Sequence, residues 1–208
     1  REIGDADVSL TRDIYLNFSV EDAERIKEIE SETNHDVKAV EYFVKAKLQE
    51  NQNTEELAEW VHFGCTSEDI NNTAYAIMLQ KARSTIMLNA MNSLVAEIES
   101  LAKLNASLAM LSRTHGQVAS PTTLGKELKN VSERLKRQIN QLESIEILGK
   151  FNGAVGNFNA HYAAYPEVNW VQLSDKFLQR LDLKINRHTA QIEPHDYIAE
   201  IFDCIKRF

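Results

Sequence analysis

Apolar residues recur at steps of three and four over a long stretch of the chain, the spacing of one face of an α-helix. This stretch covers residues 67–104 and contains neither glycine nor proline. Thr66 and Asp69 stand at its start with the spacing of a capping box. We therefore predict one helix of about 55 Å at a rise of about 1.5 Å per residue. Its apolar positions are Ile70, Ala74, Ile77, Met78, Met87, Met91, Leu94, Ile98 and Leu101.

A second long helix is predicted from Ser120 and Pro121, a pair typical of an N-cap followed by the first helical residue. Apolar residues then recur in a pattern close to a heptad repeat, with one polar interruption at Gln138, and the helix should end near Gly149. Such a repeat predicts packing nearly parallel or antiparallel to other helices. The apolar positions are Leu124, Leu128, Val131, Leu135, Leu142 and Ile145.

The rest of the pattern predicts shorter helices and no sheet. We expect helices over residues 19–29, 36–49 and 53–62, and another after Pro194. Residues 153–166 are rich in glycine, asparagine and alanine, which predicts an irregular loop. No alternation of apolar and polar residues extends beyond a few positions. The predicted fold class is therefore all-α, an extended bundle of long helices.

Composition and charge argue against two classes of binding partner, nucleic acids and membranes. The chain has 208 residues, of which 43% are hydrophobic and 26% charged, as in an ordinary globular protein. Its net charge of −8 argues against binding to a nucleic-acid backbone, which needs a basic face. No apolar run approaches the roughly 20 residues that cross a bilayer, so we expect no membrane partner. Cys65 and Cys204 make no disulfide framework, which favours a reducing, cytoplasmic setting.

Three polar clusters lie at predicted helix edges, at residues 33–36, 62–69 and 113–117, and these are the candidates for a site. His115 falls between the two long helices, where an imidazole can face a ligand and exchange protons near neutral pH. Thr66 and Ser67 offer hydroxyls and free N–H groups at a helix start, which suit a carboxylate or a phosphate. The histidines form no short-range pair of the kind that binds zinc, and we expect no metal and no cofactor.

Each cluster also has a purely structural interpretation. Asn34 or Asp36 would then only be the N-cap of the next helix, and Thr66 would only close the capping box. His115 would only shape a turn. Structural or solvent-facing roles are favoured for the other histidines near turns and helix starts, which are His161, His188 and His195.

Together the clusters resemble the bacterial type of adenylosuccinate lyase, a branch of the fumarase/aspartase superfamily. The Thr-His-Gly-Gln form of the third cluster separates this branch from the fumarases, aspartases and argininosuccinate lyases. The resemblance extends over essentially the whole chain. The matching stretches are TNHDVKAVE (33–41), CTSEDINN (65–72), SRTHGQ (112–117), GAVGN (153–157) and QIEPHDY (191–197).

The resemblance implies an all-α protomer, with residues 1–55 in an N-terminal helical domain and residues 56–208 forming the first part of a central long-helix bundle. It implies a homotetramer whose bundles merge and whose active sites each take residues from three subunits. It also implies a β-elimination in purine synthesis that releases fumarate from adenylosuccinate and gives AMP. The same enzymes cleave the succinylated aminoimidazole carboxamide ribotide.

The resemblance assigns roles to individual residues. His115 is implied to be the general acid that protonates the departing nitrogen. Thr66 and Ser67 are implied to bind the succinyl part of the substrate, with Thr114 as a helper. The positions matching nucleotide-contact and other substrate-binding residues of the family are Asn34, His35, Asp36 and Gln191.

Two segments of the family are missing from these 208 residues. One is the signature loop, Ser-Ser followed by Met-Pro and a Lys-x-Asn, which by resemblance holds the general-base serine. The other is an Arg-Tyr-Gly segment that helps to hold the phosphate. We therefore expect the chain to be an internal fragment that is inactive alone. The alternatives are a superfamily lyase for a different succinyl substrate, and a non-catalytic helical scaffold that associates through its heptad face.

Overall fold

The computed structural model describes residues 3–50 and 54–208. These residues form two compact units, each built from several parts of the chain. The first unit consists of the residues up to Ala74, Lys150–Leu178 and Asn186–Glu193. The second consists of Tyr75–Gly149, Gln179–Ile185 and Pro194–Phe208. The predicted domain division between residues 55 and 56 concerns a longer protein and stays a prediction.

The first unit is a set of short helices. It contains α1 (Asp5–Leu16), α2 (Val20–Thr33), α3 (Asp36–Gln49), the 3₁₀ helix η1 (Glu55–Trp60), the first half of α4 (Ser67–Ala82), α7 (Asn159–Ala164) and most of α8 (Trp170–Arg180). Helix α3 is central, because α1, α2 and η1 all pack against it. The buried apolar residues of this part are Val37, Ala39, Phe43, Leu48, Leu57 and Ala58.

Two predicted helices of this unit are confirmed. Helix α3 has the predicted bounds. Helix α2 begins after Ser19, whose hydroxyl accepts a hydrogen bond from the Asp22 N–H, and it extends to Thr33, beyond the predicted end at residue 29. The predicted helix over residues 53–62 is a 3₁₀ helix from Glu55 to Trp60, and residue 53 lies outside the described residues. The predicted irregular loop over residues 153–166 was wrong in part, because it contains α7. Helices α1 and α8 were not predicted.

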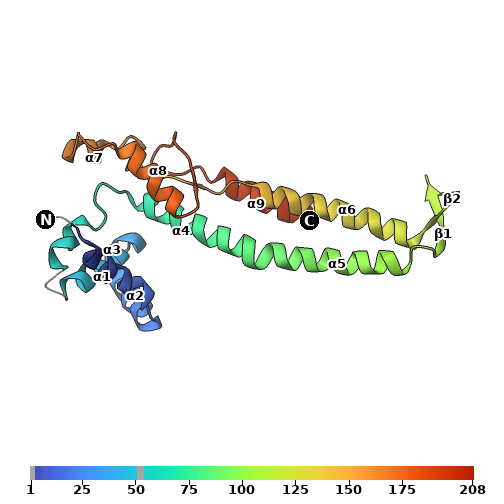
Figure 1. The fold of residues 1–208 in the computed structure, drawn as a ribbon, viewed down its shortest axis with the longest axis horizontal. Coiled ribbons are helices and arrows are strands. Elements are labelled where there is room, and N and C mark those ends of the chain that lie inside the picture. The colour runs from blue at the N-terminus through green and yellow to red at the C-terminus, as the bar shows by residue number, and fades with distance from the viewer. Residues whose placement is uncertain (1–2, 51–53) are drawn as a thin grey trace. The chain divides into compact units, whose positions relative to one another are not determined.

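The second unit is dominated by two long helices (Figure 1). The run from α4 continues through a π-helical segment, η2 (Arg83–Met87), into α5 (Leu88–Leu104), so the predicted helix over residues 67–104 is confirmed with one irregular turn. Helix α6 (Leu124–Ser144) returns antiparallel beside α5. Helix α9 (Asp196–Arg207) packs on α6. Arg207 donates from Nε to Gln138 Oε1 at 2.9 Å, so the polar interruption in the heptad pattern receives a partner from α9.

A β-hairpin joins α5 to α6, where no strand was predicted. Strands β1 (Ala109–Thr114) and β2 (Gln117–Thr123) pair antiparallel with an irregularity after Leu111. Pro121 lies opposite Leu111 in this ladder, so its assignment to the start of a helix was wrong. The helix begins three residues later because Thr123 is the N-cap, with its Oγ1 accepting from the Lys126 N–H at 3.2 Å.

The far end of α6 also differs from the prediction. The helix ends at Ser144, and not near Gly149, because the following residues extend to form strand β3 (Leu148–Gly149). This strand pairs in parallel with β4 (Lys184–Ile185). With only these two small sheets among the described residues, the predicted all-α class is confirmed. None of the described helices is long and apolar enough to span a bilayer.

Close packing of α5 and α6 depends on a small residue. Gly125 is buried, and a Cβ at this position would collide with the Ala102 carbonyl and lie 2.6 Å from the Ala106 Cα. The fully buried row of α6 is formed by Gly125, Ser132, Ile139 and Leu142. Of the predicted heptad positions, Leu142 is buried, whereas Val131 is 40% exposed.

We expect Gly125→Ala to destabilise the full-length protein by about 1–3 kcal/mol, because the obstructing atoms belong to the backbone and cannot rotate away. The measurement is urea-induced unfolding. Gly4→Ala is the matched control, since a Cβ there meets only Asp7 Oδ2 at 4.0 Å. Equal unfolding free energies for the two variants would contradict the packing model.

Candidate active site

The predicted site residues fall into two groups. Asn34, His35, Asp36, Thr66, Ser67 and Gln191 belong to the first unit, whereas Thr114 and His115 belong to the second. The first group comes from three separate parts of the sequence. Within the first unit, the structure brings the cluster at residues 33–36 into contact with the cluster at residues 62–69.

His35 and Ser67 form the contact between the two clusters, with Nε2 and Oγ 3.2 Å apart. The other ring nitrogen of His35, Nδ1, accepts from the Lys38 N–H at 3.2 Å and caps α3. A neutral imidazole that accepts at Nδ1 carries its proton at Nε2, so His35 donates to the Ser67 oxygen. The Ser67 hydroxyl proton can therefore be directed to a ligand.

Asp36 lies beside this contact and stays ionised. The pKa of Asp36 is lowered mainly because the Val37 N–H donates to its carboxylate, at 2.7 Å. Asn71 of α4 donates from Nδ2 to Asp36 Oδ2 at 3.3 Å and adds to this effect. The negative charge of Asp36 and the donors around it provide a polar edge that can hydrogen-bond the hydroxyls of a ligand.

The purely structural interpretation of residues 33–36 predicts Asn34 or Asp36 as the N-cap of α3, and the structure differs from it. Asn34 adopts a left-handed conformation, with φ of 52°, and ends α2 through its N–H, which donates to the Glu30 carbonyl. His35, and neither Asn34 nor Asp36, is the N-cap of α3. Asparagine tolerates the left-handed region better than most residues, which explains its place between the two helices.

Thr66 and Ser67 stand at the start of α4. The Thr66 N–H donates to Asp69 Oδ2 at 2.8 Å, so the carboxylate half of the predicted capping box is confirmed. The first turn of a helix carries partial positive charge, which favours an anionic group nearby. Asp69 itself is buried, at 1% exposure, and its ion pair with Lys150 shows that it faces the interior.

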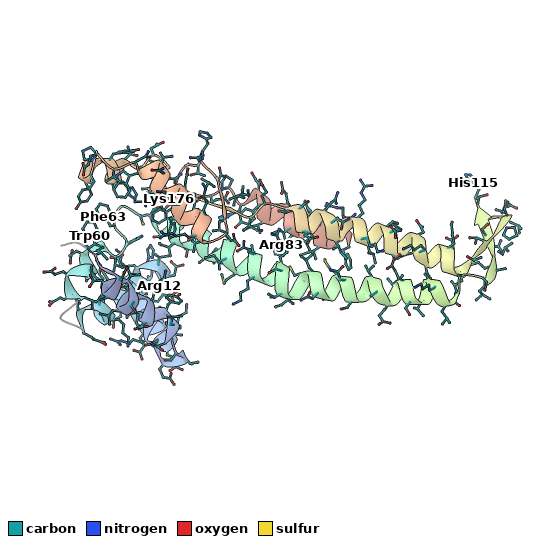
Figure 2. All side chains as sticks on the ribbon, viewed as in Figure 1. Arg12, Trp60, Phe63, Arg83, His115 and Lys176 are labelled. Carbon is teal, nitrogen blue, oxygen red and sulfur yellow. The ribbon has the colours of Figure 1, made fainter. Side chains whose placement is uncertain are left out.

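His115 occupies the turn of the β-hairpin. His115 and Gly116 both have positive φ, 50° and 74°, as a two-residue turn of type I′ requires, and Thr114 pairs with Gln117 across it. The side chain is exposed. Figure 2 shows His115 at the tip of the hairpin, directed away from α5 and α6. An imidazole in this position can meet a group that approaches from outside the second unit.

A carboxylate–imidazole pair near the first group was missed by sequence reasoning. Glu41 Oε2 lies 2.8 Å from His62 Nδ1, and Lys38 and Lys45 add ion pairs at 2.6 and 3.0 Å. Burial alone would raise the pKa of Glu41, but hydrogen bonds from Lys38, Lys45 and His62 outweigh it and lower this pKa to about 2. No spacing rule joins Glu41, which lies on α3, to His62, which lies in the turn after η1.

The remaining chemistry of the site is limited. Burial raises the pKa of the Cys65 thiol to about 12, helped by the negative charge of Asp69, so Cys65 is a poor nucleophile. Within residues 3–50 and 54–208, no three His, Cys, Asp or Glu side chains gather to hold a metal ion. The arrangement therefore offers hydroxyls, amides, an ionised carboxylate and imidazoles.

The architecture is that of the helical fumarase/aspartase-like fold. A fumarate lyase from Mesorhizobium sp. BNC1 superposes with a TM-score of 0.79 at 19% identity, covering 99% of this chain and 46% of that chain. β-Carboxy-cis,cis-muconate cycloisomerase from Acinetobacter calcoaceticus sp. ADP1 gives 0.78 at 20% identity, covering 99% and 46%. A family model described as a lyase matches residues 1–208, and the chain belongs to this lyase family.

Two relatives with higher sequence identity are both adenylosuccinate lyases. The chain is 55% identical over 195 residues to adenylosuccinate lyase of Escherichia coli (strain K12), and this match covers 94% of the chain. It is 46% identical over 208 residues to adenylosuccinate lyase of Buchnera aphidicola subsp. Schizaphis graminum (strain Sg), covering all of the chain. The chain spans 43% and 46% of the lengths of these two relatives.

Substitution of Glu41 by glutamine should lower stability at neutral pH by on the order of 2–3 kcal/mol. The folded pKa of Glu41 is about 2, below the unfolded value near ~4.3, so its contribution is full above pH ~4.3 and is lost as the pH falls toward 2. Urea unfolding from pH 7 downward should therefore show a constant deficit that shrinks below pH ~4.3. Glu24→Gln, at an exposed position of α2, is the control. A pH-independent deficit would contradict this account.

Proposed function

We propose that the protein containing this chain is an adenylosuccinate lyase, which eliminates fumarate from adenylosuccinate to give AMP. It would cleave the succinylated aminoimidazole carboxamide ribotide in the same way. The observation that carries the proposal is 55% identity over 94% of the chain to an enzyme of that name. The polar contacts between the clusters at residues 33–36 and 62–69 support it, since these are the family stretches that the sequence matches.

The reaction defines what the residues must do. A general base removes a proton from the carbon next to a carboxylate, the electron pair forms the carbon–carbon double bond, and the carbon–nitrogen bond breaks. The departing nitrogen then takes a proton from a general acid. An imidazole is suited to this step because it exchanges protons near neutral pH. We assign the step to His115, whose exposed position at the hairpin turn supports it.

Thr66 and Ser67 would bind the succinyl carboxylate on which negative charge develops. Hydroxyl donors and a helix N-terminus aimed at this charge stabilise the transition state more than the bound substrate. The donation from His35 to Ser67 supports this role, because it leaves the serine proton for the substrate. Thr114 would assist His115. The nucleotide part would be contacted by Asn34, His35 and Asp36, and Gln191 would bind another part of the substrate.

The proposal includes a homotetramer in which each site takes residues from several subunits. Exposed apolar side chains on the long helices support it, because a solvated bundle would normally bury them. Leu104 is 80% exposed and Ile86 67%. The hairpin is also largely exposed, although an isolated two-stranded hairpin is marginally stable. We place the enzyme in the cytoplasm, which the unpaired state of both cysteines supports.

We expect His115→Ala in the full-length protein to lower kcat by about 10²–10⁴-fold, the contribution of a general acid. The assay follows AMP and fumarate released from adenylosuccinate. His188→Ala, at another exposed histidine, is the control and should retain activity. An active wild type with an unaffected His115→Ala variant would remove His115 from this role. An intact tetramer with no turnover of adenylosuccinate would remove the proposed reaction.

The 208-residue chain alone should show no turnover. The signature loop and the phosphate-holding segment expected from the resemblance are outside it, so it would have the acid without the base. The same assay at micromolar protein tests this, with the full-length enzyme at equal concentration as the positive control. Fumarate release by the isolated chain above the rate without protein would show that the general base lies within these residues.

A further inference from the structure

The first unit contains a fully buried ion pair that the reaction does not require. Lys150 has no exposed surface, and its Nζ lies 3.1 Å from Oδ1 of Asp69. The ammonium also donates to the carbonyls of Gly153 at 3.0 Å and Gln191 at 2.6 Å. An ammonium has three protons to donate, so these three acceptors satisfy it completely.

The partner carboxylate is equally well satisfied. Asp69 Oδ2 accepts from the Thr66 N–H at 2.8 Å and from the Gly153 N–H at 3.1 Å. Asp69 Oδ1 accepts from the Asn152 N–H at 3.0 Å. The pair therefore connects three segments of the backbone: the turn before α4, the segment that follows Gly149, and the residue Gln191.

Further contacts fix the middle segment on both sides. Asn72 of α4 clamps the backbone of Lys150, with Oδ1 accepting from the Lys150 N–H at 2.8 Å and Nδ2 donating to the Lys150 carbonyl at 3.0 Å. Asn152 donates from Nδ2 to Thr189 Oγ1 at 2.9 Å. Gly156 packs directly under the Thr189 carbonyl, where a Cβ would collide. The middle segment is thus held to α4 on one side and to residues 189–191 on the other.

A buried ion pair of this kind is weak evidence for stability. Removing two charges from water costs several kcal/mol for each ion, and apolar residues of similar volume are often equally stable in such positions. The arrangement gives a defined geometry, because a shift of any one segment would take a hydrogen-bond partner from one of the two buried charges. Two of the three segments that it connects contain proposed substrate-binding residues, Thr66 and Ser67 in one and Gln191 in the other.

We propose that Lys150 and Asp69 form a positioning pair that holds the Thr66–Ser67 turn and the Gln191 segment at a fixed separation, so that both contact the same substrate molecule. The bond between Asn152 and Thr189 is a second connection with the same effect. This inference rests on the proposed function, which assigns these segments to substrate. Neither Lys150 nor Asp69 touches the substrate in this scheme.

The test uses the full-length enzyme with adenylosuccinate as substrate. Lys150→Met alone should unfold at a much lower temperature, because it leaves the Asp69 carboxylate buried and unpaired. The double variant Asp69→Asn with Lys150→Met removes both charges and should recover most of the melting temperature. Its kcat/KM should nevertheless stay about 10²-fold below wild type, mainly through KM, because a displacement of about 1 Å is enough for such a loss.

A purely structural pair gives a different result. In that case the double variant would recover kcat/KM together with the melting temperature, and this outcome would overturn the proposal. The control double variant, Arg25→Met with Glu28→Gln, neutralises an exposed ion pair on α2 and should leave kinetics unchanged. If wild type itself does not turn over adenylosuccinate, the proposed function fails, which is a separate result.

If the double variant fails to fold, the variant Thr189→Val tests the connection between Asn152 and the segment with Gln191. This nearly isosteric change removes only the oxygen that accepts from Asn152. A several-fold rise in KM with an unchanged melting temperature supports the proposal. An unchanged KM overturns the part of the proposal that rests on the Asn152–Thr189 bond, because the segment with Gln191 would then not depend on this second connection.

Discussion

Burial of the Lys150–Asp69 ion pair is the constraint on which the first unit depends. Both groups are charged and almost without exposed surface, so each of their polar atoms must have a partner inside the protein. The partners come from the turn before α4, from residues 152 and 153, and from Gln191. A requirement for so many simultaneous bonds allows few arrangements of these three backbone segments.

The second unit depends on a different constraint, the approach of two long helices. Gly125 allows the backbone of α6 to lie against Ala102 and Ala106 at the end of α5. Ser132 and Ile139 continue this close row at steps of seven, while Val131 on the neighbouring row stays exposed. Helix α6 therefore has two faces. The row with Gly125, Ser132 and Ile139 is buried within the chain, and the row with Val131 is exposed. An open apolar row is the physical reason to expect further helices against it.

Periodicity was sufficient to predict the elements whose formation is local. The helix over residues 67–104 and α3 follow from apolar spacing and capping residues, and both are confirmed. The hairpin was missed because Ser120 and Pro121 imitate a helix start, while the actual signal is a two-residue turn at His115 and Gly116. Pro121 has no N–H to donate, yet the strand tolerates it, as proline is tolerated at the edge of a sheet.

The site could be predicted only where its residues are close in sequence. Thr66 and Asp69 share a capping box, so their contact was expected. Glu41 also contacts His62, 21 residues away, and Asp69 contacts Lys150, 81 residues away, and no local rule joins either pair. Even for Asp69, recognised as a capping residue, spacing could not distinguish a solvent-facing carboxylate from a buried one. That distinction depends on what the tertiary fold places over it.

The exposed turn with His115 and the buried Lys150–Asp69 pair suit different tasks in the proposed elimination. A general acid must lose and regain a proton in every turnover, which is easiest where water or substrate can reach both forms, and His115 has such a position in an exposed turn. The groups that orient the substrate must keep one charge and one geometry throughout. In this proposal a buried pair does this, because the ammonium of Lys150 and the carboxylate of Asp69 are each held by several hydrogen bonds. Under this proposal the residue that exchanges a proton is exposed, and the residues that orient the substrate are held by a buried ion pair.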